Sequence, residues 1–162
     1  MHAIDAITQA VGRVLAICFP IMVLLTAGIV AARYLFDAGA IAVQEAVMYL
    51  HAATVMLGLG YALRHDAHVR VDVLANRLGP RARAAVELAG HLLFLLPVTV
   101  AVIWFCWDYV AASWRIREGS PEVGGIPGVF LLKTLLPLGA ALLLLQGVAE
   151  TLRTLTKLRT LR

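Results

Sequence analysis

The chain has 162 residues, of which 61% are hydrophobic and 15% are charged, and its formal net charge is +4. Soluble domains are about 45–50% apolar and about 25% charged, so this composition excludes a soluble enzyme core, a collagen-like repeat and a disordered chain. The basic residues flank apolar stretches, which favours anionic lipid over nucleic acid as their partner.

Four apolar stretches are long enough to cross a hydrocarbon core of about 30 Å at about 1.5 Å per residue. They cover residues 14–32, 41–63, 88–107 and 129–149. Each segment outside them is shorter than the roughly 50 residues that a soluble domain needs. The sequence therefore predicts an all-α fold, in which residues 1–162 form a single membrane domain built as an integral membrane four-helix bundle.

The first two spans bring one charged residue each to the same membrane face. Arg33 follows the span 14–32, and Glu45 lies a few residues inside the span 41–63. A charge inside the hydrocarbon costs a few kcal/mol, and the glutamate side chain is too short to reach water easily. We therefore expect Glu45 to pair with Arg33, with Lys133 or with a basic group of a partner chain. The alternative is that each charge reaches water by itself.

The segment between the second and third spans predicts an amphipathic helix over about 69–78. Four apolar residues share one arc of a helical wheel, namely Val71, Leu74, Ala75 and Leu78, and Gly79-Pro80 marks the end of the helix. We expect this helix to lie in the cytoplasmic membrane interface; the alternative is an ordinary basic loop. The residues assigned to this interfacial helix and its lipid contact are His68, Arg70, Asp72, Arg77, Arg81 and Arg83.

The last two spans repeat the placement of charges near one face. Asp108 follows the third span, and Lys133 lies a few residues inside the fourth. Two acids and two bases at similar depth predict an outer charge cluster at a subunit interface, made of Arg33, Glu45, Asp108 and Lys133. The basic tail after residue 149 is expected to extend the fourth helix.

The distribution of lysine and arginine predicts the orientation in the membrane. Ten of them lie in the N-terminal segment, the middle segment and the tail, which four spans place on one side, and three lie on the other. Cytoplasmic segments carry the excess of Lys and Arg, so both termini are expected in the cytoplasm.

No motif in the sequence predicts catalysis. His51 and His91 suggest a haem-binding membrane anchor of a redox enzyme, but helix rise places them at different depths. His65 and His68 have the spacing of metal ligands without a third strong ligand nearby. We expect no catalytic, cofactor or metal site. A second alternative is a stand-alone four-helix proton-coupled exporter that uses Glu45.

Several short motifs follow one another in an order that resembles a known family. They are Arg33-Tyr34-Leu35-Phe36, Gln44-Glu45, Tyr61-Ala62-Leu63-Arg64, His68-Val69-Arg70-Val71-Asp72, Ser120-Pro121, Gly125-Ile126-Pro127, Lys133, Pro137-Leu138-Gly139 and Gln146. With the four-span frame, they resemble the small permease subunit, the DctQ-like family, of tripartite ATP-independent periplasmic (TRAP) transporters. The resemblance runs from Arg33 to Gln146.

This resemblance implies a role beside a larger transport protein. In the family, a large permease holds the substrate and sodium sites, and a periplasmic binding protein delivers an organic anion that usually carries a carboxylate. The small subunit clamps to the large permease and enlarges its fixed scaffold. The resemblance thus implies a multi-pass protein of the bacterial inner membrane, with the large permease as its partner and the binding protein as a transient one.

Overall fold

The computed structural model describes residues 2–65, 67 and 78–160, and the regular structure in this part of the chain is entirely helical. Its elements are α1 (His2–Phe36), α2 (Ile41–Arg64), α4 (Pro80–Gly90), the π-helical turn η1 (His91–Leu95), α5 (Leu96–Arg115) and α6 (Val129–Thr160). Because α4, η1 and α5 are continuous, four helices are long and apolar enough to cross a membrane. The predicted all-α membrane fold with four spans is confirmed.

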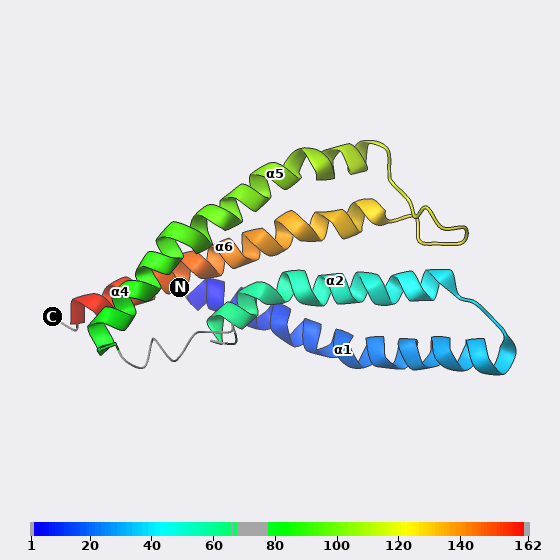
Figure 1. Cartoon of the computed structure of the whole chain (residues 1–162), viewed down its shortest axis with the longest axis horizontal. Coiled ribbons are helices and arrows are strands. Elements are labelled where there is room, and N and C mark those ends of the chain that lie inside the picture. The colour runs from blue at the N-terminus through cyan, green and yellow to red at the C-terminus, as the bar shows by residue number, and fades with distance from the viewer. Residues whose placement is uncertain (1, 66, 68–77, 161–162) are drawn as a thin grey trace.

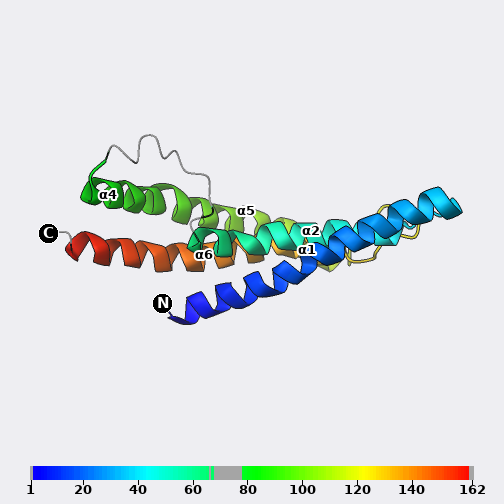
Figure 2. The same ribbon diagram turned by 90° about the horizontal axis from the view of Figure 1, so that it is seen from below.

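The four helices form an open bundle in the order α1, α2, α6, α5 (Figure 1). α2 and α6 pack along each other in the middle, α1 packs on α2, and α5 packs on α6. Among the described residues no extended contact joins α1 to α5. Seen from below, α1 crosses the other helices obliquely (Figure 2). Every helix therefore presents much of its surface to lipid or to a partner.

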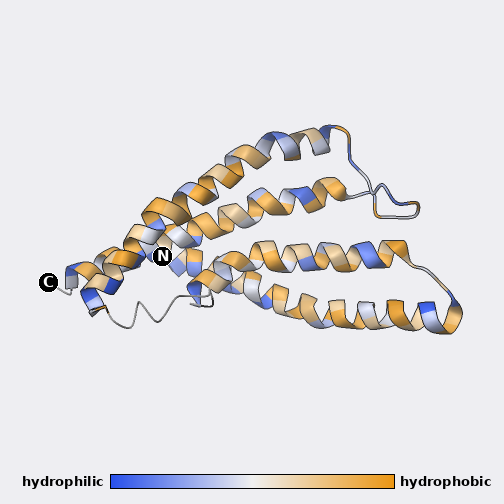
Figure 3. Cartoon of the chain, in the orientation of Figure 1, coloured by the Kyte–Doolittle hydropathy of each residue, from blue (hydrophilic) through white to orange (hydrophobic). Residues whose placement is uncertain are grey.

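The start of α1, the end of α2, the start of α4 and the end of α6 lie at one end of the bundle, which we call the terminal end (Figure 1). The connections 37–40 and 116–128 lie at the other, which we call the loop end. α1 stops before Asp37, and α5 stops before Arg117; both residues have left-handed backbones, with φ of 51° and 48°. Apolar segments prevail between the two ends, whereas hydrophilic ones are concentrated near them (Figure 3).

Three helices are longer at the terminal end than the apolar stretches that predict them. α1 begins at His2, the third spanning helix begins at Pro80, and α6 continues to Thr160. Proline suits the first turn of a helix, where its missing N–H leaves no hydrogen bond unmade. The sequence prediction counted only apolar residues, so it missed these polar extensions except at the tail. The predicted interfacial helix, about 69–78, lies outside the described residues except for Leu78.

Glycines let the two central helices approach each other closely. A Cβ added at Gly139 of α6 would lie 2.6 Å from the carbonyl oxygen of Met56 in α2. A Cβ at Gly60 of α2 would lie 3.2 Å from the carbonyl oxygen of Leu142 in α6. Small residues at helix contacts are typical of membrane proteins, where close backbone packing replaces the hydrophobic effect. The α2–α6 contact is therefore the tight centre of the bundle.

Candidate functional site

At the loop end, Glu45 of α2 fastens the loop 116–128 to the helix. Its carboxylate accepts a 2.6 Å hydrogen bond from the backbone N–H of Ile126 and another from the Ser120 hydroxyl. Hydrogen bonds to an ionised carboxylate are roughly twice as strong as neutral ones. The absence of a side chain at Gly125 permits this approach, because a Cβ there would lie 2.7 Å from a carboxylate oxygen of Glu45. Glu45 thus joins α2 to the loop that precedes α6.

Lys133, near the start of α6, is held by groups of the same loop and of α5. Its ammonium donates to the Glu118 carboxylate at 2.5 Å and lies 4.1 Å from the centroid of the Tyr109 ring. An anion and an aromatic face both favour the charged form of lysine. Nearby, the indole N–H of Trp114 donates to the Thr134 hydroxyl at 2.9 Å. These contacts connect α5, the loop and α6.

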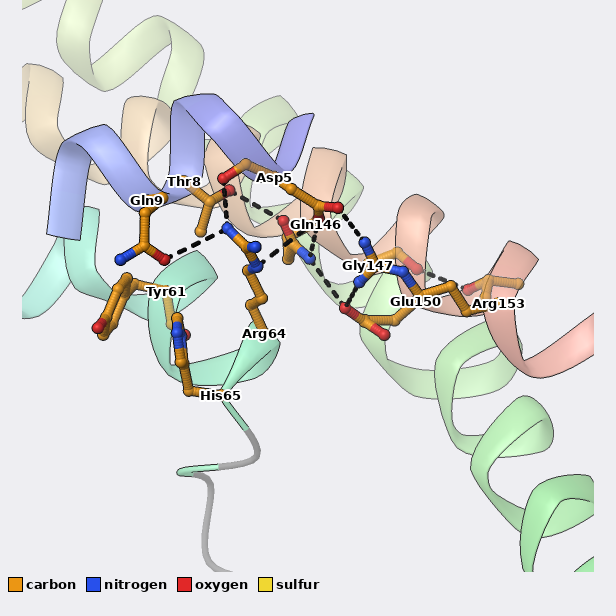
Figure 4. Close-up of polar contacts among 11 residues, drawn as sticks. Asp5, Thr8, Gln9, Tyr61, Arg64, His65, Gln146, Gly147, Glu150 and Arg153 are labelled. Carbon is orange, nitrogen blue, oxygen red and sulfur yellow. Dashed lines mark hydrogen bonds and ion pairs between the residues drawn. The ribbon is translucent and has the colours of Figure 1, made fainter. Parts of the chain in front are cut away.

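At the terminal end, polar residues from α1, α2 and α6 form one connected network (Figure 4). This terminal polar network consists of Asp5, Thr8, Gln9, Arg64, Gln146, Glu150 and Arg153. The Asp5 carboxylate is bonded to the Arg153 guanidinium and lies 3.8 Å from Nε of Arg64. Asp5 of α1 is therefore shared by two basic residues, Arg64 of α2 and Arg153 of α6.

Gln146 is the buried centre of this network. Its side chain is fully buried, and its Oε1 accepts a 2.9 Å hydrogen bond from the Thr8 hydroxyl. Its Nε2 donates to Glu150 at 2.9 Å and to Asp5 at 3.5 Å. A buried amide costs free energy unless its donors and acceptor are satisfied, so these bonds require α1 to stay against α6. The network thus holds the N-terminal part of α1 in place.

Comparison with known families identifies the chain. Residues 21–157 match the family described as tripartite ATP-independent periplasmic transporters, DctQ component. The chain belongs to this family. The resemblance predicted from the sequence is thereby confirmed, and the family is a transporter component rather than a family of enzymes. A search of curated proteins finds no match to the chain.

The pairing predicted for Glu45 in this DctQ family member is wrong within the chain. None of the ion pairs between described residues joins Glu45 to Arg33 or Lys133. The loop is the physical reason, because it brings Glu118 to Lys133 and a backbone N–H to Glu45. Arg33 and Asp108 are exposed. The four residues of the predicted outer charge cluster therefore lie toward the same end of the bundle, but no ion pair in the described chain joins them to one another. The role of this cluster at a subunit interface stays a prediction.

The residues assigned to lipid contact are only partly described. His68, Arg70, Asp72 and Arg77 lie outside the described residues. Arg81 is exposed in the first turn of α4, and the Nε of Arg83 lies 3.7 Å from the Glu87 carboxylate. Their contact with lipid headgroups stays a prediction.

The two histidines considered as haem ligands lie on helices that share no extended contact in the described chain. α6 lies between α2, which carries His51, and the continuous helix of which η1 and His91 are part. Within the described residues, no group of three or more His, Cys, Asp or Glu side chains is arranged to hold a metal ion.

Sequence reasoning missed the terminal polar network of this DctQ chain. Asp5 and Thr8 precede the first apolar stretch, and their partner Gln146 lies 138 residues beyond Thr8 along the chain. The one available signal is Gln146 itself, because an amide inside an apolar span needs partners. That signal predicts a contact but not which helix supplies it.

Replacing Glu45 by alanine is expected to release the loop 116–128 from α2. The Ile126 N–H then loses a charged acceptor, so its hydrogen exchange should accelerate about 10-fold or more, as expected for a bond of roughly 1.5–3 kcal/mol. Exchange mass spectrometry in detergent measures this directly. Glu122→Ala, an exposed acid of the same loop, is the control and should leave exchange at Ile126 unchanged. Equal protection of the Ile126 N–H from exchange in both variants would contradict the proposed bond between Glu45 and the loop.

The Glu118–Lys133 pair predicts a pH dependence of stability. The hydrogen bond from the Lys133 ammonium holds the pKa of Glu118 below its ordinary value of 4.5. An acid with a lowered pKa in the folded state stabilises it fully above the unfolded pKa, and this stabilisation is lost as pH falls through the folded pKa. The thermal midpoint of Glu118→Gln should therefore lie below that of wild type by a constant amount above pH 4.5. The gap should narrow at lower pH; a constant gap down to pH 3 would contradict the assignment.

Proposed function

We propose that the chain is a fixed scaffold subunit of a TRAP transporter. In this proposal it supports a large permease that carries out sodium-coupled uptake of an organic carboxylate anion, which a periplasmic protein delivers. The observation that carries the proposal is the position of the charged contacts along the bundle. The charged contacts of the described residues lie near the two ends of the bundle, where they bind its own helices and loop to one another.

The described threonines in the middle of the membrane-spanning region are bonded within their own helices rather than to a shared polar site. Secondary transporters place substrate and ion sites near the midplane, at broken helices. In the described spans, the hydroxyls of Thr26, Thr54 and Thr99 instead donate to carbonyls of their own helices at 2.7–2.9 Å. Glu45, on which a proton-coupled exporter would depend, is bonded to the loop. These contacts favour a supporting role over transport by this chain alone.

Reconstitution tests the proposal. The large permease, the binding protein and this chain are incorporated into liposomes with an inward sodium gradient, and each is then omitted in turn. We expect uptake only when this chain and the large permease are both present. Uptake by this chain alone would overturn the scaffold role, and full-rate uptake without it would show that the scaffold is dispensable.

We also propose that the terminal end faces the cytoplasm and that the chain lies in the bacterial inner membrane. The charge distribution of the sequence supports this orientation. Cysteines introduced singly at Val123, 91% exposed in the loop, and at exposed Arg81 test it in a chain whose Cys18 and Cys106 are replaced by alanine. An impermeant maleimide should label the first in intact spheroplasts and spare the second. The reverse pattern would invert the orientation.

A further inference from the structure

One face of α2 is exposed along much of the helix. Its members recur at alternating intervals of three and four residues, and they are Ile41, Gln44, Met48, His51 and Val55. Residues at this spacing share one face of an α-helix.

His51 is the polar residue in the middle of this exposed face. It lies near the midpoint of α2, about 15 Å from the start of the helix by its rise, and its side chain is exposed. No described residue forms a hydrogen bond with it, whereas the neighbouring Thr54 donates to the carbonyl of Leu50 at 2.8 Å. An ionisable group at this depth nearly always faces protein or a water-filled cavity and has a partner.

A groove beside His51 is shaped by small and apolar side chains. It has a volume of about 670 Å³, and α1 and α2 supply its walls. Ala27 and Ala31, one turn apart on α1, line the groove together with Val47 and His51 of α2. Small residues at this spacing permit the close approach of another helix backbone. We call this surface the α1–α2 groove.

We propose that the α1–α2 groove receives a transmembrane helix of the large permease and that this helix carries a hydrogen-bonding side chain opposite His51. The inference rests on the proposed function and adds to it the surface and the chemistry of contact. A neutral imidazole has one N–H donor and one acceptor nitrogen, so it fits a hydroxyl, amide or carboxyl group. An acyl chain offers neither, which is why lipid is not a matching occupant for the centre of the groove.

Affinity measurements on the complete chain with the large permease test this proposal. Ala27→Leu fills the groove, and His51→Leu removes its polar group; each is expected to weaken binding about 3- to 30-fold, the range for one interhelical hydrogen bond or packing contact. His51→Gln keeps donor and acceptor and should bind nearly as wild type. The matched control is Ala16→Leu, at an exposed alanine of α1 that does not line the groove. Thermal midpoints of the isolated variants exclude misfolding as the cause.

The outcomes separate the inference from the function on which it rests. If wild type binds the permease and the groove variants bind equally well, the groove is not the interface, although the scaffold role stands. If wild type does not bind, both proposals fail.

Photocrosslinking gives an independent readout. A photoreactive benzoylphenylalanine replaces Met48, and the same residue at Phe105 of α5, which is 78% exposed, serves as the reference position. We expect adducts with the permease at position 48; adducts there with lipid alone, or with a second copy of this chain, would overturn the proposal.

Discussion

Replacing Gly139 by leucine is expected to separate the two central helices and to destabilise the chain by about 3 kcal/mol, at the upper end of overpacking effects. The reason is that the new Cβ would meet a backbone atom rather than a movable side chain. It would lie 2.6 Å from the carbonyl oxygen of Met56 and 2.9 Å from the carbonyl carbon. Relief therefore requires a shift of α2 or α6 as a whole.

The matched control for this experiment is Gly28→Leu. Gly28 lies inside α1, and a Cβ added there would have no neighbour within 4 Å. Since leucine is a better helix former than glycine, this variant should be as stable as wild type or slightly more stable. Intrinsic tryptophan fluorescence during heating in one detergent compares the two. Equal midpoints for both variants would show that the close α2–α6 approach is not needed.

Replacing Asp5 by asparagine is expected to loosen α1 at the terminal end and to lower stability by about 2–3 kcal/mol. The reason is that charged hydrogen bonds are lost, Arg64 loses its acidic partner, and Arg153 keeps only Glu150. Asp5 is 14% exposed, and it accepts from Arg153 and Gln146. Fully buried pairs cost more to break, but the Arg153 side chain is 34% exposed and therefore partly solvated. Thermal unfolding of the two proteins measures the difference.

A double-mutant cycle of Asp5→Asn with Arg153→Gln isolates the pair itself. We expect the double variant to be less unstable than the sum of the single variants predicts, by roughly 0.5–3 kcal/mol. Asp37→Asn is the control for the chemical change, since Asp37 is exposed and has a left-handed backbone that asparagine tolerates. Additive single effects would mean that Asp5 and Arg153 are not coupled.

Apolar length allowed the four spans to be predicted, because a helix that crosses a bilayer must be apolar for about 20 residues. The start of α2 at Ile41 and of α6 at Val129 matches the predicted starts. The order of the helices in the open bundle was not predictable, since lipid-facing and partner-facing apolar residues look alike. The approach of Gly139 to Met56 depends on that order.

It could be predicted from the sequence which residues need a polar partner, but not which group supplies it. Glu45 was expected to pair with a basic side chain, but its carboxylate instead accepts from the Ile126 backbone N–H and the Ser120 hydroxyl, both in the loop 116–128. Lys133 likewise takes its anion from Glu118 in the loop rather than from another span. The link between Asp5 and Arg153 joins residues 148 positions apart, and only the assembled helices bring them together.

The two groups of polar contacts also fix the length of the apolar belt that lies between them. On α2, Glu45 of the loop-end contacts and Arg64 of the terminal polar network lie nineteen residues apart, about 28 Å at the rise of an α-helix. Because both groups are tied to several helices, the apolar belt between them cannot lengthen or shorten with its surroundings. In a thicker or thinner bilayer, such a protein answers hydrophobic mismatch by tilting or by deforming the lipid around it. A mismatch between this belt and the surrounding lipid is therefore expected to appear as tilt of the bundle or as a local change in bilayer thickness.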